Sequence, residues 1–124
     1  MQGKKILIVD DNPVIVELLQ RKLGREGYEV DGCVESGEAV KKCMENKPDL
    51  VILDILMPGK SGWDILQEIK SNPETENIAV IISTVKNRPE DLEKVRDLKA
   101  EDYIAKPYVF SDLLEKVQNI LGSG

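Results

Sequence analysis

Short apolar runs alternate along the sequence with longer segments whose apolar residues recur at helical spacing. Three runs are strongly aliphatic: Lys5 to Val9, Leu50 to Leu53 and Ala79 to Ser83. Runs rich in Val and Ile are typical of strands that are covered on both faces of a sheet. Glu29 to Cys33 and Asp102 to Ala105 are less apolar, and we predict that they form two further strands.

Each predicted strand is followed by a segment with an apolar face of helical period. The apolar positions of these five segments are Val14, Ile15, Leu18, Leu19 and Leu23; Ala39, Val40, Cys43 and Met44; Ile65, Leu66 and Ile69; Leu92, Val95 and Leu98; and Leu113, Leu114, Val117 and Leu121. Pro13 suits a first helical turn, and Ser36 and Ser111 suit N-cap positions. The pattern therefore predicts five strand-helix repeats.

Strict alternation of strands and helices predicts an α/β fold with parallel strands and with helices on both faces of one sheet. In such sheets, ligands bind beyond the C-terminal ends of the strands. A chain of 124 residues suits a single core, so we expect one domain over residues 1–121. The closing Gly122-Ser123-Gly124 is expected to be a flexible tail or an appended remnant.

Composition narrows the classes of function. The formal net charge is -6 and Lys and Arg are not clustered, which argues against direct nucleic-acid binding. No apolar stretch approaches the roughly 20 residues of a membrane span, and the N-terminus lacks a signal peptide, so we expect a cytoplasmic protein without membrane contact.

Cys33 and Cys43 are expected to be core thiols. The absence of histidine excludes Ser-His and Cys-His nucleophile pairs and leaves metal binding mainly to oxygen ligands.

Acidic residues end two of the predicted strands. Asp10 and Asp11 follow the first strand and Asp54 follows the third, so neighbouring parallel strands bring three carboxylates together. A divalent cation relieves their repulsion, and Mg²⁺ prefers carboxylate, water and phosphate oxygens. Asp10 and Asp11 alone are explained as well by capping of the helix that begins near Pro13. That explanation does not account for Asp54, and we therefore predict Mg²⁺ as the cofactor.

Two further polar residues end the fourth and fifth predicted strands. Thr84 contributes a hydroxyl group and Lys106 contributes an ammonium group suited to phosphate. A carboxylate nucleophile, a cation, a hydroxyl and an ammonium together suit phosphoryl transfer to Asp54, with an acyl phosphate as the product.

These motifs resemble the receiver domains of response regulators over residues 4–121. The resemblance rests on four blocks: Val9-Asp10-Asp11; Asp54-Ile55-Leu56-Met57-Pro58-Gly59-Lys60-Ser61-Gly62; Thr84 after Ile81-Ile82-Ser83; and Tyr103-Ile104-Ala105-Lys106-Pro107. It implies a flavodoxin-like, doubly wound (βα)5 fold with strand order 2-1-3-4-5.

The resemblance also implies roles for individual residues. Asp54 is the implied phosphoacceptor, and Thr84 and Lys106 bind phosphoryl oxygens. The implied Mg²⁺ ligands are Asp11 directly, Asp10 mostly through water, Asp54, and the carbonyl of Leu56. A cis bond is implied between Lys106 and Pro107, and Thr84 and Tyr103 are the implied switch residues.

The same resemblance implies the partners. A histidine kinase or a histidine phosphotransfer protein supplies the phosphoryl group in trans, because this chain has no histidine. The surface around Ile15, Leu18 and Leu19 is expected to meet the helices of that donor. A downstream protein, an output domain or a second copy of the chain is expected to bind the face formed by the fourth helix, the fifth strand and the fifth helix.

Such a protein catalyses its own phosphorylation and dephosphorylation and is not a conventional turnover enzyme. The alternative is an interaction module that keeps the fold and binds its partner independently of phosphorylation. The presence of Asp10, Asp11, Asp54, Thr84 and Lys106 together argues against that alternative.

Four residues depart from the usual receiver pattern. Val85 replaces a small residue, and its bulk is expected to slow phosphorylation by small donors. Leu56 and Lys86 are expected to slow the loss of the phosphoryl group. Lys99 stands at a position that often needs left-handed geometry, which costs a Lys residue roughly 1 kcal/mol.

Overall fold

The computed structural model describes residues 3–85 and 89–122, which form a five-stranded parallel sheet. The strands are β1 (Lys5–Val9), β2 (Glu29–Cys33), β3 (Leu50–Asp54), β4 (Ala79–Thr84) and β5 (Asp102–Ala105). Their spatial order is β2-β1-β3-β4-β5. This order confirms the predicted doubly wound α/β fold.

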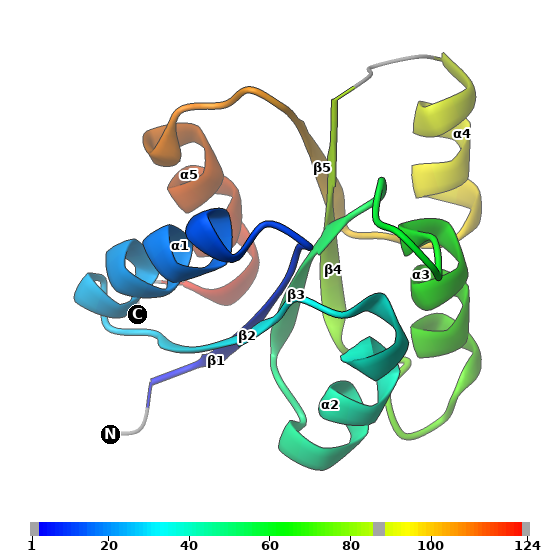
Figure 1. The fold of residues 1–124 in the computed structure, drawn as a ribbon, viewed down its shortest axis with the longest axis horizontal. Helices are drawn as coiled ribbons and strands as arrows, with labels where there is room; N and C mark the ends of the chain where they lie inside the picture. The colour runs from blue at the N-terminus through cyan, green and yellow to red at the C-terminus, as the bar shows by residue number, and fades with distance from the viewer. Residues whose placement is uncertain (1–2, 86–88, 123–124) are drawn as a thin grey trace.

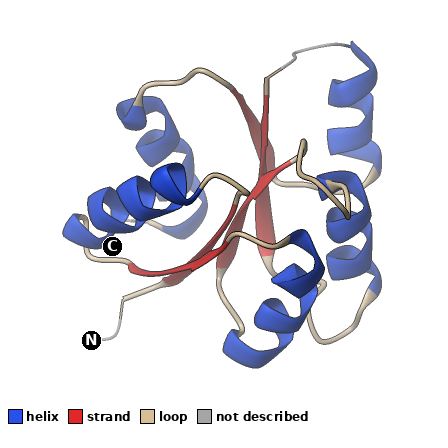
Figure 2. Cartoon of the chain, in the orientation of Figure 1, coloured by secondary structure: helices blue, strands red, loops and turns tan. Residues whose placement is uncertain are grey.

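Helices cover both faces of the sheet. They are α1 (Pro13–Arg25), α2 (Ala39–Asn46), α3 (Gly62–Ser71), α4 (Pro89–Asp97) and α5 (Phe110–Leu121). α1 and α5 lie on one face, and α2, α3 and α4 lie on the other (Figure 1). Figure 2 shows the sheet edge-on between these two helical layers. No helix in the described part of the chain is long and apolar enough to cross a membrane.

The core has two halves because successive side chains of a strand point to opposite faces. In β3, Leu50 and Ile52 pack toward α1 and α5, whereas Val51 and Leu53 pack toward α2 and α3. All four side chains are buried. Burial on both faces explains why the central strands are continuous apolar runs.

Both predicted serine N-caps were wrong. Ser36 begins a short 3-10 helix (Ser36–Glu38) ahead of α2, and Ser111 lies inside α5 after the N-cap residue Val109. The Ser36 hydroxyl instead donates to the Pro58 carbonyl at 3.0 Å and accepts from the Lys60 amide at 2.9 Å. Serine is common at helix N-caps, but the Ser36 side chain hydrogen-bonds the loop that contains Pro58 and Lys60, which is distant in sequence.

Both cysteines are buried and free, as predicted. Burial raises the pKa of the Cys43 thiol to about 12, and the nearby Cys33 adds to the effect. A thiol with such a pKa is almost entirely protonated at neutral pH and is a poor nucleophile.

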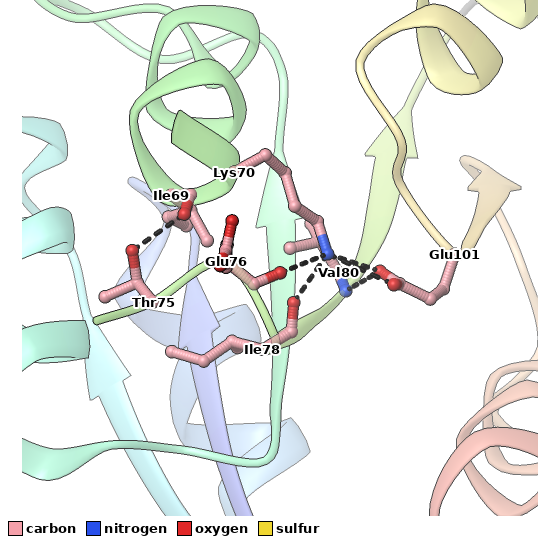
Figure 3. Close-up of polar contacts among 7 residues, drawn as sticks. All are labelled: Ile69, Lys70, Thr75, Glu76, Ile78, Val80 and Glu101. Atoms are coloured by element: carbon pink, nitrogen blue, oxygen red, sulfur yellow. Dashed lines mark hydrogen bonds and ion pairs between the residues drawn. The ribbon is translucent and has the colours of Figure 1, made fainter. Parts of the chain in front are cut away.

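A polar network joins the loops at the N-terminal edge of β4 and β5 (Figure 3). The Lys70 ammonium donates to the Ile78 carbonyl at 2.8 Å and to both carboxylate oxygens of Glu101 at 3.1 Å. Glu101 also accepts from the Val80 amide at 2.7 Å. We call these four residues the Lys70–Glu101 network; it ties the end of α3 to the loop that precedes β5.

Candidate functional site

Three charged side chains meet at the C-terminal edge of the sheet. The Lys106 ammonium donates to Asp10 Oδ2 at 2.9 Å and lies 3.5 Å from Asp54 Oδ1. Lys106 follows β5, Asp54 ends β3, and Asp10 follows β1, so the lysine side chain reaches over the end of β4. Together with the neighbouring Asp11, we call these residues the acidic site.

Burial and charge act against each other in this site. Burial raises the pKa of Asp54; the Lys106 ammonium lowers it, and the Asp10 carboxylate raises it again, so the net shift is upward. Burial alone lowers the pKa of Lys106, but its hydrogen bond to Asp10 and the charges of Asp10 and Asp54 outweigh burial and raise it. The lysine therefore stays protonated while the carboxylate of Asp54 is destabilised.

Backbone geometry holds Asp10 in place. Its Oδ1 accepts from the Asn12 amide at 2.9 Å, while its Oδ2 accepts from Lys106. Asn12 is the N-cap of α1 and accepts from the Val14 amide at 3.0 Å. The alternative that Asp10 and Asp11 cap this helix is therefore wrong. The prediction missed Asn12, although an Asn directly before Pro13 is itself a helix-start signal.

The acidic residues have the geometry of a cation site. One carboxylate oxygen each from Asp10, Asp11 and Asp54 lies within 4.8 Å of the others. Asp11 is exposed, whereas Asp10 and Asp54 are buried. Oxygen-only donors that include an exposed carboxylate suit Mg²⁺, which keeps several water ligands.

Close backbone packing supports Asp54 from the following loop. The Leu56 amide donates to Asp54 Oδ1 at 3.4 Å, and the Gly62 amide donates to the Ile55 carbonyl at 3.1 Å. A Cβ atom at Gly62 would collide with the Asp54 carbonyl oxygen. Gly62, the last residue of the predicted motif from Asp54 to Gly62, therefore has no room for a side chain. The Leu56 side chain is 61% exposed beside the site.

Thr84 and Tyr103 occupy the face of the sheet that is covered by α3 and α4. Thr84 is buried at the end of β4, and its carbonyl accepts from the Lys106 amide at 2.7 Å. Tyr103 is half-buried against the same half of the core as Val95, and it pairs with Ile82, two residues before Thr84. The two predicted switch residues thus lie on one face, with Tyr103 farther from the acidic site.

The bond between Lys106 and Pro107 is cis, as the family resemblance implied. Beside it, an apolar groove of about 680 Å³ separates α1 from the loop that connects β5 to α5. The residues that line the groove include Leu18, Val85, Lys106, Pro107 and Phe110. The acidic site therefore opens next to an apolar surface.

The predicted departures have different outcomes. Lys99 has a φ of 65°, so the expected left-handed geometry is confirmed. Val85 is 53% exposed and lines the groove together with Lys106. Lys86 lies outside the described residues.

Comparisons with known proteins agree with this geometry. The family model described as response regulator receiver domain matches residues 6–118. The phosphate regulon transcriptional regulatory protein PhoB of Rhizobium meliloti is 38% identical over 119 residues, which cover 94% of this chain. The match covers 52% of PhoB, so the chain spans about half the length of this curated relative.

Solved structures have the same fold. Chemotaxis protein CheY4 of Vibrio cholerae has a TM-score of 0.90 at 25% identity, with 96% of this chain and 99% of CheY4 covered. A CheY-like receiver domain protein of Methanospirillum hungatei has a TM-score of 0.89 at 31% identity, with 96% and 94% covered.

Proposed function

The chain belongs to the response-regulator receiver family of two-component systems, and on that premise we propose that Asp54 accepts a phosphoryl group from a partner phosphohistidine. Receiver domains are in general phosphorylated by histidine kinases, interact with downstream targets and typically use Mg²⁺. The observation that carries the proposal for this chain is the Lys106 ammonium, held between the buried carboxylates of Asp10 and Asp54 at an open edge of the sheet.

In the proposed reaction, a carboxylate oxygen of Asp54 forms a bond to phosphorus while the phosphorus–nitrogen bond of the donor breaks. The bonding electron pair stays on the imidazole nitrogen, and the imidazole leaves neutral when its other nitrogen carries a proton. Lys106 and the Thr84 hydroxyl bind phosphoryl oxygens and stabilise their charge. Asp10, Asp11, Asp54 and the Leu56 carbonyl would hold Mg²⁺, which would further neutralise that charge.

The apolar groove beside the acidic site is the proposed docking surface for the donor. Leu18 is 42% exposed on α1, and the groove also contains Phe110 at the start of α5. An apolar surface next to the acceptor suits the helices that carry a phosphohistidine, because docking there brings the phosphoryl group to Asp54. We expect this exchange to take place in the cytoplasm.

The proposed output is a change in the face formed by α4, β5 and α5. The new charge on Asp54 attracts Thr84, and Tyr103, two residues farther from the site on the same face of the sheet, follows. α4 is suited to such a change because Asp91 is its one buried residue, while Val95 is only partly buried. A downstream protein, an output domain or a second copy of this domain, which we assign to residues 1–121, would bind that face.

Intact-mass spectrometry after incubation with acetyl phosphate tests the proposal. We expect one added phosphoryl group on the wild type in Mg²⁺, and none in EDTA or on Asp54→Asn. Asp97→Asn is the matched control, because the Asp97 side chain is 70% exposed in an ion pair with Arg96; it should label like the wild type. Absence of labelling, even with a cognate kinase present, would favour a module that binds its partner independently of phosphorylation.

A further inference from the structure

Ser83 carries a buried hydroxyl group that the proposed reaction does not use. The residue lies in β4 and is 3% exposed. Over residues 3–85 and 89–122, its Oγ is the one buried side-chain oxygen or nitrogen for which the structure gives no hydrogen-bond partner. Burying an unpaired hydroxyl costs free energy, whereas an apolar side chain at this place would not. A hydroxyl here is therefore expected to have a use beyond packing.

The sheet register places Ser83 next to the acceptor. Ser83 pairs with Asp54 on β3 and with Ile104 on β5. Ile52 and Ile104 belong to the half of the core packed against α1 and α5, and alternation along the strands puts Asp54 and Lys106 on that same face. Ser83 therefore shares its face with both members of the ion pair.

The path of the Lys106 side chain brings it over Ser83. Lys106 follows β5, and its ammonium reaches Asp54 on β3 and Asp10 beyond β1, so its methylene chain crosses the end of β4. Of its two acidic neighbours, Asp10 is the nearer at 2.9 Å, and Asp54 lies at 3.5 Å. A shift of the ammonium from Asp10 toward Asp54 moves it one strand closer to β4, where Ser83 lies.

We propose that Ser83 is a positioning residue for Lys106, with its hydroxyl accepting a hydrogen bond from the ammonium as this group moves from Asp10 to the phosphoryl oxygens on Asp54. The inference rests on the proposed function. A lysine ammonium has three N–H donors on a flexible stem, so two acidic neighbours leave a donor for Ser83. Fixing this stem over the acceptor lowers the cost of ordering Lys106 during transfer.

The test uses an isosteric pair, Ser83→Thr and Ser83→Val, together with Ser83→Ala. Thr keeps the hydroxyl, whereas Val has the same shape without it. We expect Ser83→Ala and Ser83→Val to lower the maximal rate of labelling by acetyl phosphate in Mg²⁺ by about 10- to 100-fold, the effect of one hydrogen bond to a charged group. Ser83→Thr should stay near the wild-type rate, and the donor concentration at half-maximal rate should not change.

Urea unfolding of the same variants separates positioning from packing. Loss of an unpaired buried hydroxyl should leave Ser83→Ala as stable as the wild type or more so, although it labels more slowly. Equal rates for the Thr and Val variants, or a wild-type rate for Ser83→Ala, would overturn the inference while the proposed function stands. A wild type that takes up no phosphoryl group would overturn both.

Discussion

The two edges of the sheet each contain a lysine that reaches an acidic partner, but the two sites differ in how their charges are balanced. Lys70 donates to Glu101 and to the Ile78 carbonyl, and Glu101 also accepts from the Val80 amide (Figure 3). At the opposite edge, Lys106 is shared by two carboxylates, of which Asp54 is 3.5 Å away.

Burial of the lysine does not explain the difference. The Lys70 side chain is 11% exposed and the Lys106 side chain is 18% exposed. The acids differ more: the Glu101 side chain is 38% exposed, whereas that of Asp54 is 7% exposed and has a raised pKa. A half-exposed ion pair with several backbone partners stabilises the fold, whereas a buried, crowded site that destabilises one of its own carboxylates keeps charged groups available for chemistry at some cost in stability.

The largest expected effect is a loss of stability in Glu101→Ala, which removes the central acid of the Lys70–Glu101 network. The change removes the partner of Lys70 and the acceptor of the Val80 amide, and we expect the free energy of unfolding to fall by about 2 kcal/mol. Urea unfolding measures this loss. Labelling by acetyl phosphate should keep its wild-type rate, because the network lies at the edge away from Asp54.

Glu17→Ala is the control for that prediction. Glu17 pairs with Arg21 at 3.6 Å, with side chains 76% and 57% exposed, so its removal should cost less than about 0.5 kcal/mol. Equal losses for Glu17→Ala and Glu101→Ala would show that the Lys70–Glu101 network is no more stabilising than a surface ion pair.

Asp54→Asn, at the C-terminal edge, should instead raise the free energy of unfolding. The raised pKa of Asp54 means that the folded state binds its proton more tightly than the unfolded state, so ionisation at neutral pH reduces stability. We expect Asp54→Asn to raise the free energy of unfolding at pH 7 in EDTA by about 1 kcal/mol, the size of gain typical when a destabilised functional site is relieved. The gain should shrink as the pH falls and Asp54 becomes protonated in the wild type. If Asp54→Asn is less stable than the wild type at pH 7, the ionised Asp54 carboxylate does not destabilise the fold, and the contrast with Glu101 fails.

Lys99→Gly, near the N-terminal edge of the sheet, should raise the free energy of unfolding. Lys99 adopts a φ of 65° two residues before Glu101, and glycine takes this conformation without the steric cost of a Cβ atom. The expected gain is about 1 kcal/mol by urea unfolding. Glu93→Gly, in the middle of α4, should instead lose about 1 kcal/mol, because glycine weakens a helix interior. A loss on Lys99→Gly would refute the strain argument.

The smallest expected effect concerns access to the acidic site. Val85→Ala widens the groove that Val85 lines together with Lys106, and we expect acetyl phosphate to label Asp54 about threefold faster, or about 0.7 kcal/mol in activation free energy. Val109→Ala serves as the comparison, because Val109 is 61% exposed and does not line the groove. An unchanged rate in Val85→Ala would show that this side chain does not limit access.

The sequence by itself determined the order of the elements, the fold class and the composition of the acidic site. Continuous apolar runs such as Leu50 to Leu53 require burial on both faces, and parallel strands place their C-terminal ends at one edge. Asp10, Asp54 and Lys106 were therefore predictable as neighbours. Helix-start serines were not, because several residues near a helix start suit its N-cap equally well.

Only the tertiary structure decided which polar groups are paired. Lys70 and Glu101 are 31 residues apart, and no local pattern distinguishes them from surface charges. Ser83 ends an apolar run in the sequence, and only the structure shows that its buried hydroxyl lacks a hydrogen-bond partner and that its register partner is Asp54. Periodicity reports which face a residue occupies, whereas hydrogen-bond partners depend on side chains brought together from distant parts of the chain.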